Sequence, residues 1–117
     1  MSLNYHFEKK QDVLLIRLNG ELDHHHAIAL RKEWEKQLKL DDVKHVVINL
    51  EKLVFMDSSG LGVFLGRYKQ IKEKRGEMIV CGVRPTVERL FELSGLYKLV
   101  GRAPDEPSAF KHLGVAS

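Results

Sequence analysis

Cysteine is almost absent from this sequence: Cys81 is the single one among 117 residues. A lone cysteine excludes an internal disulfide and fits a reducing compartment. The sequence also lacks an apolar run near the roughly 20 residues that a membrane-spanning helix requires. Its first six residues lack the basic-then-apolar order of a signal peptide. These absences predict a cytoplasmic protein without a membrane partner.

Charge of a single sign is not concentrated anywhere in the chain. There are 19 lysines and arginines against 16 aspartates and glutamates, which gives a net charge of +3 and a pI of about 9.0. A basic pI is compatible with nucleic-acid binding, but the acids are dispersed among the bases. No basic arm, RNA-binding aromatic motif or zinc-finger spacing is present. The sequence therefore predicts no nucleic-acid partner.

The sequence does contain short apolar strands that alternate with amphipathic helices. Because one turn, 10–12, separates the first two strands, we expect them to form an antiparallel hairpin. The pattern predicts a single α/β domain over residues 1–117, a mixed sheet with about four helices packed on it. The predicted strands are 5–8, 13–22, 44–50, 78–83 and 99–100, and the predicted helices are 24–40, a second from 58, a third from 84 and a terminal one after 107.

Particular residues predict where the helices begin, end and face the core. Asp23 is expected to cap the first helix and Asp41-Asp42 to end it. Arg75-Gly76 is expected to supply a glycine C-cap for the second helix. The residues expected to face the core are Ala27, Leu30, Trp34 and Leu38 in the first helix, and Val87, Leu90, Phe91 and Leu93 in the third.

The stretch 54–62, Val-Phe-Met-Asp-Ser-Ser-Gly-Leu-Gly, combines chemistry with a sharp structural transition. It lies between the apolar strand 46–50 and a helix pattern that repeats at i, i+3 and i+4. An acid, two hydroxyls and a glycine are typical of a helix start. We therefore expect the hydroxyl of Ser58 or Ser59 at the surface, beside free backbone N–H groups and the positive end of a helix dipole.

Enzymatic interpretations of this stretch are poorly supported. Gly60, Gly62 and Gly66 superficially resemble a dinucleotide-binding turn, but the next predicted strand ends without the acidic residue that such a site uses. No Gly-Lys-Ser/Thr closes a phosphate loop, and neither serine lies in a Gly-x-Ser-x-Gly elbow. The sequence predicts no cofactor and no catalytic residue. A small serine hydrolase or phosphotransfer protein remains the enzymatic alternative.

The triplet His24-His25-His26 suggests a metal site only at first sight. Consecutive residues of a helix point about 100° apart, so these side chains cannot converge on one ion. We interpret the triplet as a solvated helix start and predict no metal. Cys81 lies in an apolar strand, where an unreactive core thiol is expected.

The remaining interpretation makes Ser58 or Ser59 a target of phosphorylation, with plain helix caps as the alternative. A phosphate adds a charge of about −1.5 to −2, which a helix N-terminus favours and the adjacent Asp57 opposes. Glycines at exposed helix positions cost about 1 kcal/mol each relative to alanine. Close approach of a partner to the backbone offers a reason for them. We therefore predict a docking strip that begins at the serines, on the face formed by Ser59, Gly62, Val63, Gly66 and Gln70.

Three motifs together resemble the STAS-domain anti-sigma factor antagonists, in particular those that act on the anti-sigma-F factor in sporulation. The resemblance covers essentially the whole chain. The motifs are Gly20-Glu21-Leu22-Asp23, Met56-Asp57-Ser58-Ser59-Gly60-Leu61-Gly62 and Arg89-Leu90-Phe91-Glu92-Leu93-Ser94-Gly95-Leu96.

The resemblance implies a partner switch. The unphosphorylated protein would bind an anti-sigma factor that is also an ATP-dependent serine kinase, and so release a sigma factor. Phosphorylation of Ser58 would end this binding, and a metal-dependent serine phosphatase would restore it. Partner contacts are expected at Asp23, Asp57, Ser58, Ser59, Gly60, Gly62, Val63 and Gly66. A related STAS module serving a stress-response system is the alternative within the family.

Overall fold

Five strands form one mixed sheet in the order β1-β2-β3-β4-β5. Strand β1 pairs antiparallel with β2, and the later neighbours pair in parallel. The structure is a computed structural model that describes residues 2–40 and 42–115. Its elements are β1 (Leu3–Lys10), β2 (Val13–Leu22), α1 (His24–Leu38), β3 (His45–Met56), α2 (Ser58–Glu73), β4 (Met78–Cys81), α3 (Pro85–Ser94), a 3-10 turn η1 (Leu96–Lys98), β5 (Gly101–Ala103) and α4 (Glu106–His112).

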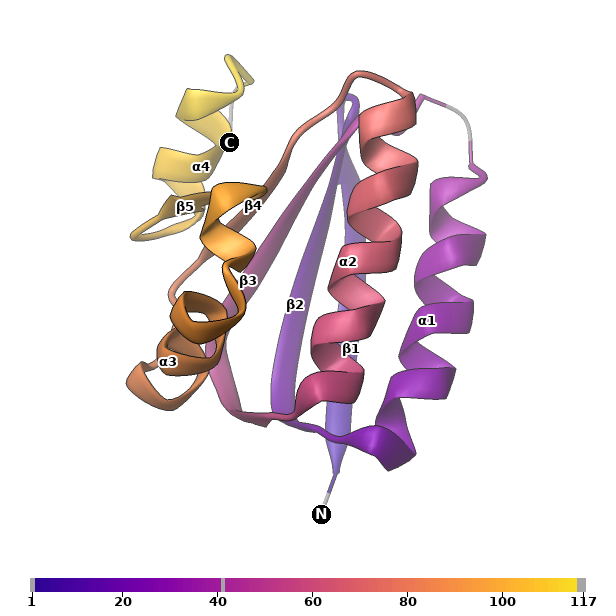
Figure 1. The fold of residues 1–117 in the computed structure, drawn as a ribbon. Coiled ribbons are helices and arrows are strands. Elements are labelled where there is room, and N and C mark those ends of the chain that lie inside the picture. The colour runs from indigo at the N-terminus through magenta and orange to yellow at the C-terminus, as the bar shows by residue number, and fades with distance from the viewer. Residues whose placement is uncertain (1, 41, 116–117) are drawn as a thin grey trace.

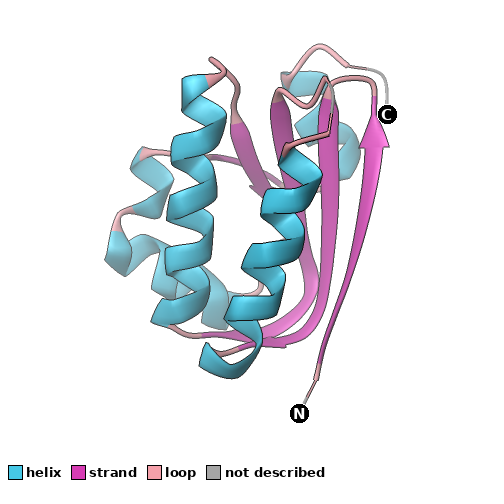
Figure 2. Ribbon diagram, turned by 90° about the vertical axis from the view of Figure 1, so that its right-hand side faces the viewer, coloured by secondary structure: helices cyan, strands magenta, loops and turns pink. Residues whose placement is uncertain are grey.

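The helices cover the two faces of the sheet unequally. Helices α1, α2 and α3 lie on one face and α4 lies on the other (Figures 1 and 2). The larger core lies under α1–α3, where Trp34 packs edge-on against Phe64 at 5.4 Å between ring centroids. The smaller core lies under α4, where Phe110 packs with the apolar residues that β2, β3 and β4 direct to that face; these are Val13, Leu15, Val47, Ile79 and Cys81.

Several predictions from the sequence are confirmed. The opening hairpin is antiparallel, and β2 has the predicted bounds. Asp23 caps α1 by accepting a hydrogen bond from the backbone N–H of His26. The four predicted core residues of α1 are all buried. Helix α1 ends at Leu38 rather than at residue 40. Asp41, expected to end it, lies outside the described residues.

Four strand predictions were wrong in their bounds. Strand β1 covers Leu3–Lys10 and not only 5–8, because it pairs with β2 along its whole length. Strand β3 continues past Leu50 to Met56, because its second half pairs with β2 beyond two register shifts, as far as Leu22 opposite Met56. The last strand is Gly101–Ala103 and not 99–100. The segment before it curls into the 3-10 turn η1, where the N–H groups of Leu99 and Val100 both donate to the Leu96 carbonyl. Strand β4 also ends early, at Cys81.

Two predictions for the helices were also wrong. Leu93 is 76% exposed, because it lies two residues, or about 200°, beyond the buried Phe91 on α3. The left-handed residue after α2 is Arg75, with φ of 62°, and not Gly76. Glycine is required at position 76 for another reason, since a Cβ there would overlap the Lys44 carbonyl oxygen.

Candidate functional site

The carboxyl ends of β2 and β3 bring two capping aspartates to the same edge of the sheet. Leu22 and Met56 are partners in the parallel pairing, and the Asp57 N–H donates to the Leu22 carbonyl at 3.3 Å. Asp23 then caps α1 and Asp57 caps α2. The two helices consequently start side by side, at the lower end of the sheet in Figure 1. The Asp23 loop therefore lies beside the serines.

The Asp57 carboxylate connects both helix starts. Its Oδ1 accepts hydrogen bonds from the N–H groups of Ser59 at 2.9 Å and Gly60 at 3.3 Å. Its Oδ2 accepts one from the N–H of His24 at 3.0 Å. One side chain thus satisfies N–H groups from the first turn of α2 and from the first residue of α1.

The two adjacent serines differ in their surroundings. Ser58 is exposed, and its hydroxyl makes no hydrogen bond within residues 2–40 and 42–115. Ser59 is half-buried, and its Oγ lies 3.2 Å from Nδ1 of His24. The first hydroxyl is free for an incoming reagent, whereas the second is already engaged.

The three histidines of α1 point to different partners. His24 faces Ser59, and His26 places Nδ1 2.7 Å from Oδ1 of Asp23. His25 makes an edge-on contact with the His26 ring at 5.1 Å. The hydrogen bonds from His26 hold the pKa of Asp23 below its usual value. The described residues contain no group of three or more metal-ligand side chains.

A groove of about 580 Å³ runs between α1 and α2 from Ser59. Its walls come from His24, Ile28 and Arg31 on α1, and Ser59, Gly62, Gly66 and Arg67 are among its residues on α2. The prediction that Val63 faces outward was wrong, because it is 5% exposed. The packing of α1 against α2 covers that side of the helix, although an isolated helix pattern leaves it open.

The glycines of α2 fall into two kinds. A Cβ on Gly60 would lie 2.8 Å from side-chain atoms of Leu22 and Met56, so this glycine is buried and allows α2 to pack on the strands. Gly60, which was expected to contact the partner, is therefore not exposed in the unbound protein. A Cβ on Gly62 or Gly66 would meet nothing within 4 Å. These two glycines keep the groove open.

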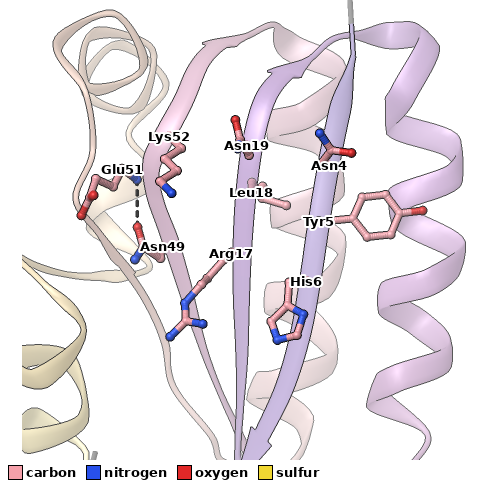
Figure 3. Close-up of a pocket in the computed structure, with 9 residues that line it drawn as sticks. All are labelled: Asn4, Tyr5, His6, Arg17, Leu18, Asn19, Asn49, Glu51 and Lys52. Carbon is pink, nitrogen blue, oxygen red and sulfur yellow. Dashed lines mark hydrogen bonds between the residues drawn. The ribbon is translucent and has the colours of Figure 1, made fainter.

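A second depression, of about 470 Å³, lies on the open face of the sheet beyond α4. Its polar side chains rise from β1, β2 and β3 (Figure 3). Arg17 is already bound there by Glu106, with Nε to Oε2 at 2.8 Å and Nη2 to Oε1 at 2.9 Å. Asn49 donates to the same carboxylate at 2.6 Å. The arrangement anchors α4 to the sheet and is typical of a solvated sheet face.

A sequence model of the STAS domain matches residues 4–112. The chain belongs to the STAS-domain family. The STAS domain is 45% identical over 117 residues to an anti-sigma F factor antagonist from Paenibacillus polymyxa, with all of both chains covered. The five-stranded mixed sheet with four helices described above is the fold of this family.

Two solved structures of SpoIIAA share the fold of this STAS domain. The phosphorylated form of SpoIIAA, described as a Bacillus cell fate determinant, superposes with a TM-score of 0.75 at 32% identity. That match covers 94% of this chain and 99% of SpoIIAA. The unphosphorylated form, described as an anti-sigma factor antagonist, gives 0.77 at 27% identity, with 95% and 98% covered. The similarity therefore extends over the whole domain in both comparisons.

Two features of the site were not predicted from the sequence. One is the contact of His24 with Asp57 and Ser59, which joins residues 33 and 35 positions apart. The other is Arg67, which is 8% exposed and lines the groove. Arg67 follows the buried Val63 by one helical turn, and this spacing was the only available signal.

Proposed function

We propose that this STAS domain is an anti-sigma factor antagonist controlled by phosphorylation of Ser58. The unphosphorylated form binds an anti-sigma factor that is also a serine kinase, and thereby releases a sporulation sigma factor. A phosphate on Ser58 ends the binding, and a metal-dependent serine phosphatase removes it. The observation that carries this proposal is the free, exposed Ser58 hydroxyl at the first position of α2.

The hydrogen bonds of the cap favour a switch without a large structural change. Asp57 already occupies the N–H groups of Ser59 and Gly60. A phosphate on Ser58 therefore cannot replace that carboxylate without breaking the cap, and the two negative charges repel each other. The phosphate is expected to project into solvent, where it meets the partner. The fold itself stays intact.

The energetic effect of one phosphate is sufficient for a switch. Placing an unpaired charge at a buried contact costs roughly 2–5 kcal/mol. Since 1.4 kcal/mol corresponds to tenfold in affinity, the phosphate is expected to weaken the complex about 30-fold or more.

The same geometry supports a role as substrate and not as enzyme. A serine nucleophile needs a base within hydrogen-bond reach of its hydroxyl. His24 directs Nδ1 at Ser59, and Ser58 has no such partner among the described residues.

No described helix is long and apolar enough to span a membrane. We place the protein's action in the cytoplasm, where sigma factors and their kinases operate.

Incubation with the anti-sigma factor and ATP, followed by mass-spectrometric mapping, tests the proposal. The wild type is expected to carry phosphate at Ser58, the Ser59→Ala variant to retain it and the Ser58→Ala variant to lose it. Ser58→Ala should also bind the anti-sigma factor constitutively. Phosphate elsewhere in the Ser58→Ala protein would refute the site. Ester hydrolysis that disappears with Ser58→Ala would instead support the enzymatic alternative.

A further inference from the structure

The groove between α1 and α2 contains a buried guanidinium that is short of hydrogen-bond acceptors. Arg67 is 8% exposed, and its Nε donates to Oε1 of Gln70 at 2.7 Å. Within residues 2–40 and 42–115 its Nη1 has no hydrogen-bond partner, and the nearest carboxylate oxygen, Oε1 of Glu35, is 3.7 Å away. A buried donor without an acceptor is costly, on the order of 1–3 kcal/mol. Buried polar groups in folded proteins are nearly always hydrogen-bonded, so this exception calls for a physical explanation.

The charges around the groove do not balance. Glu35 faces two guanidiniums, since Nε of Arg31 also lies 3.7 Å from its Oε1. Burial lowers the pKa of Arg67; the Glu35 charge opposes this and the Arg31 charge adds to it. One carboxylate for two arginines leaves a positive charge at the wall of the groove, and the Arg31 side chain remains 52% exposed.

The shape of the groove admits a chain segment close to Arg67. Gly62 and Gly66 are one turn apart on α2, and neither has an atom near the position of a Cβ. Ile28, which is 53% exposed, offers an apolar contact on the opposite wall. The groove also includes His24 and Ser59, so it begins at the residue that directly follows the proposed phosphorylation site, Ser58.

We propose that Arg31 and Arg67 bind an acidic side chain of the anti-sigma factor, seated over Gly62 and Gly66 beside Ile28. This inference rests on the proposed function, because the partner is the protein that phosphorylates Ser58. The partner segment carries an aspartate or glutamate next to an apolar residue. Its carboxylate supplies the acceptor that Glu35 does not provide. The glycines allow its backbone to approach α2.

A purely structural role for Arg67, as an ion pair that joins α1 to α2, makes different predictions. In that case its replacement lowers stability, and Arg31 and the glycines have no effect on binding. Binding measurements on several variants therefore separate the two roles. Each variant is first checked for an unchanged urea midpoint.

The first experiment measures affinity for the anti-sigma factor by calorimetry at two salt concentrations. Arg31→Gln and Arg67→Met are each expected to weaken binding about tenfold and to reduce its salt dependence. Lys69→Gln is the matched control, since it removes the same charge from an exposed position of α2 and should change affinity less than twofold. If Arg67→Met does not fold, Gly66→Leu replaces it, because a leucine there fills the groove. Wild-type affinity in the folded Arg31→Gln and groove variants would overturn the proposal.

The second experiment identifies the acid directly. The Arg31→Lys variant, in complex with the anti-sigma factor, is treated with a carbodiimide, which joins an amine to a carboxylate with loss of water. Peptide mapping is expected to show position 31 linked to an aspartate or glutamate of the partner. A complex that forms without this cross-link would contradict the inference alone. Failure of the wild type to bind the anti-sigma factor would contradict the proposed function instead.

Discussion

The backbone N–H of His24, the first residue of α1, donates a 3.0 Å hydrogen bond to the Asp57 carboxylate that caps α2. The two helices on either side of the groove are thus fixed to each other at the end where Ser58 lies. Asp57 is thus a helix cap for α2 and also holds the start of α1 beside the start of α2.

Replacement of Asp57 by alanine is expected to destabilise the protein by about 1–3 kcal/mol, because three N–H groups lose their acceptor. Urea unfolding measures the change. Asp105→Ala is the matched control, since Asp105 caps α4 through the single N–H of Ser108. Equal losses for the two variants would show that the contact between helix starts contributes nothing.

The two kinds of glycine in α2 predict substitutions of opposite sign. Gly62→Ala is expected to stabilise the protein by up to about 1 kcal/mol, since the Cβ meets open space and alanine favours the helix. Gly60→Ala is expected to destabilise it by about 1–3 kcal/mol, because the Cβ crowds Leu22 and Met56. Thermal melts of both proteins provide the comparison. The account of the helix packing fails if Gly60→Ala melts at or above the wild-type temperature.

Cys81 is expected to be unreactive in the folded protein. Burial, with a smaller contribution from the Glu106 charge, raises the pKa of its thiol to about 12, so almost no thiolate forms near pH 8. Labelling with a thiol reagent should be negligible under native conditions and rapid in urea, where the pKa returns to about 8.5. Labelling at the same rate in both conditions would show that the thiol is accessible.

The ion pair of Arg17 and Glu106 predicts a loss of stability in acid. The hydrogen bond from Arg17 holds the pKa of Glu106 below its usual value. The contribution of Glu106 is therefore complete above the unfolded pKa of about 4.3 and is lost as the pH falls through the lower folded value.

Glu106→Gln should therefore lower stability by about 1 kcal/mol at pH 7, a value reduced by the partial exposure of Arg17, and should flatten the fall below pH 5. Urea titrations at several pH values measure both effects. The exposed Glu92→Gln variant is the control. If the stability of Glu106→Gln falls below pH 5 as steeply as that of the wild type, Glu106 is not the group responsible for the loss.

The sequence predicted most reliably what depends on near neighbours. The cap at Asp23 was predicted because a capping side chain acts within three residues of itself. For α2 the serines were considered as caps, whereas Asp57 is the residue that caps the helix. The buried face of α1 was predictable from its period. Features that depend on contact with another helix or strand were not predictable. Val63 is buried because α1 packs against it, and Gly76 is required because Lys44 passes close to it.

In the candidate site, too, the features that depend on a second helix could not be predicted from the sequence. The residues alone left Ser58 and Ser59 open as phosphorylation sites, and only the resemblance to the STAS antagonists singled out Ser58. The difference between Ser58 and Ser59 depends on His24, which arrives from another helix. The environment of Arg67, whose Nη1 lies 3.7 Å from Glu35 on α1, is likewise visible only when α1 and α2 are placed side by side.

The affinity of the anti-sigma factor for the Ser58-phosphorylated protein, relative to the unphosphorylated one, tests the central claim most directly. The free energies of unfolding of the two forms should agree within about 1 kcal/mol, since the Asp57 cap is retained. Calorimetry should then show binding weakened about 30-fold or more by the phosphate. Equal affinities of the two folded forms would contradict the account.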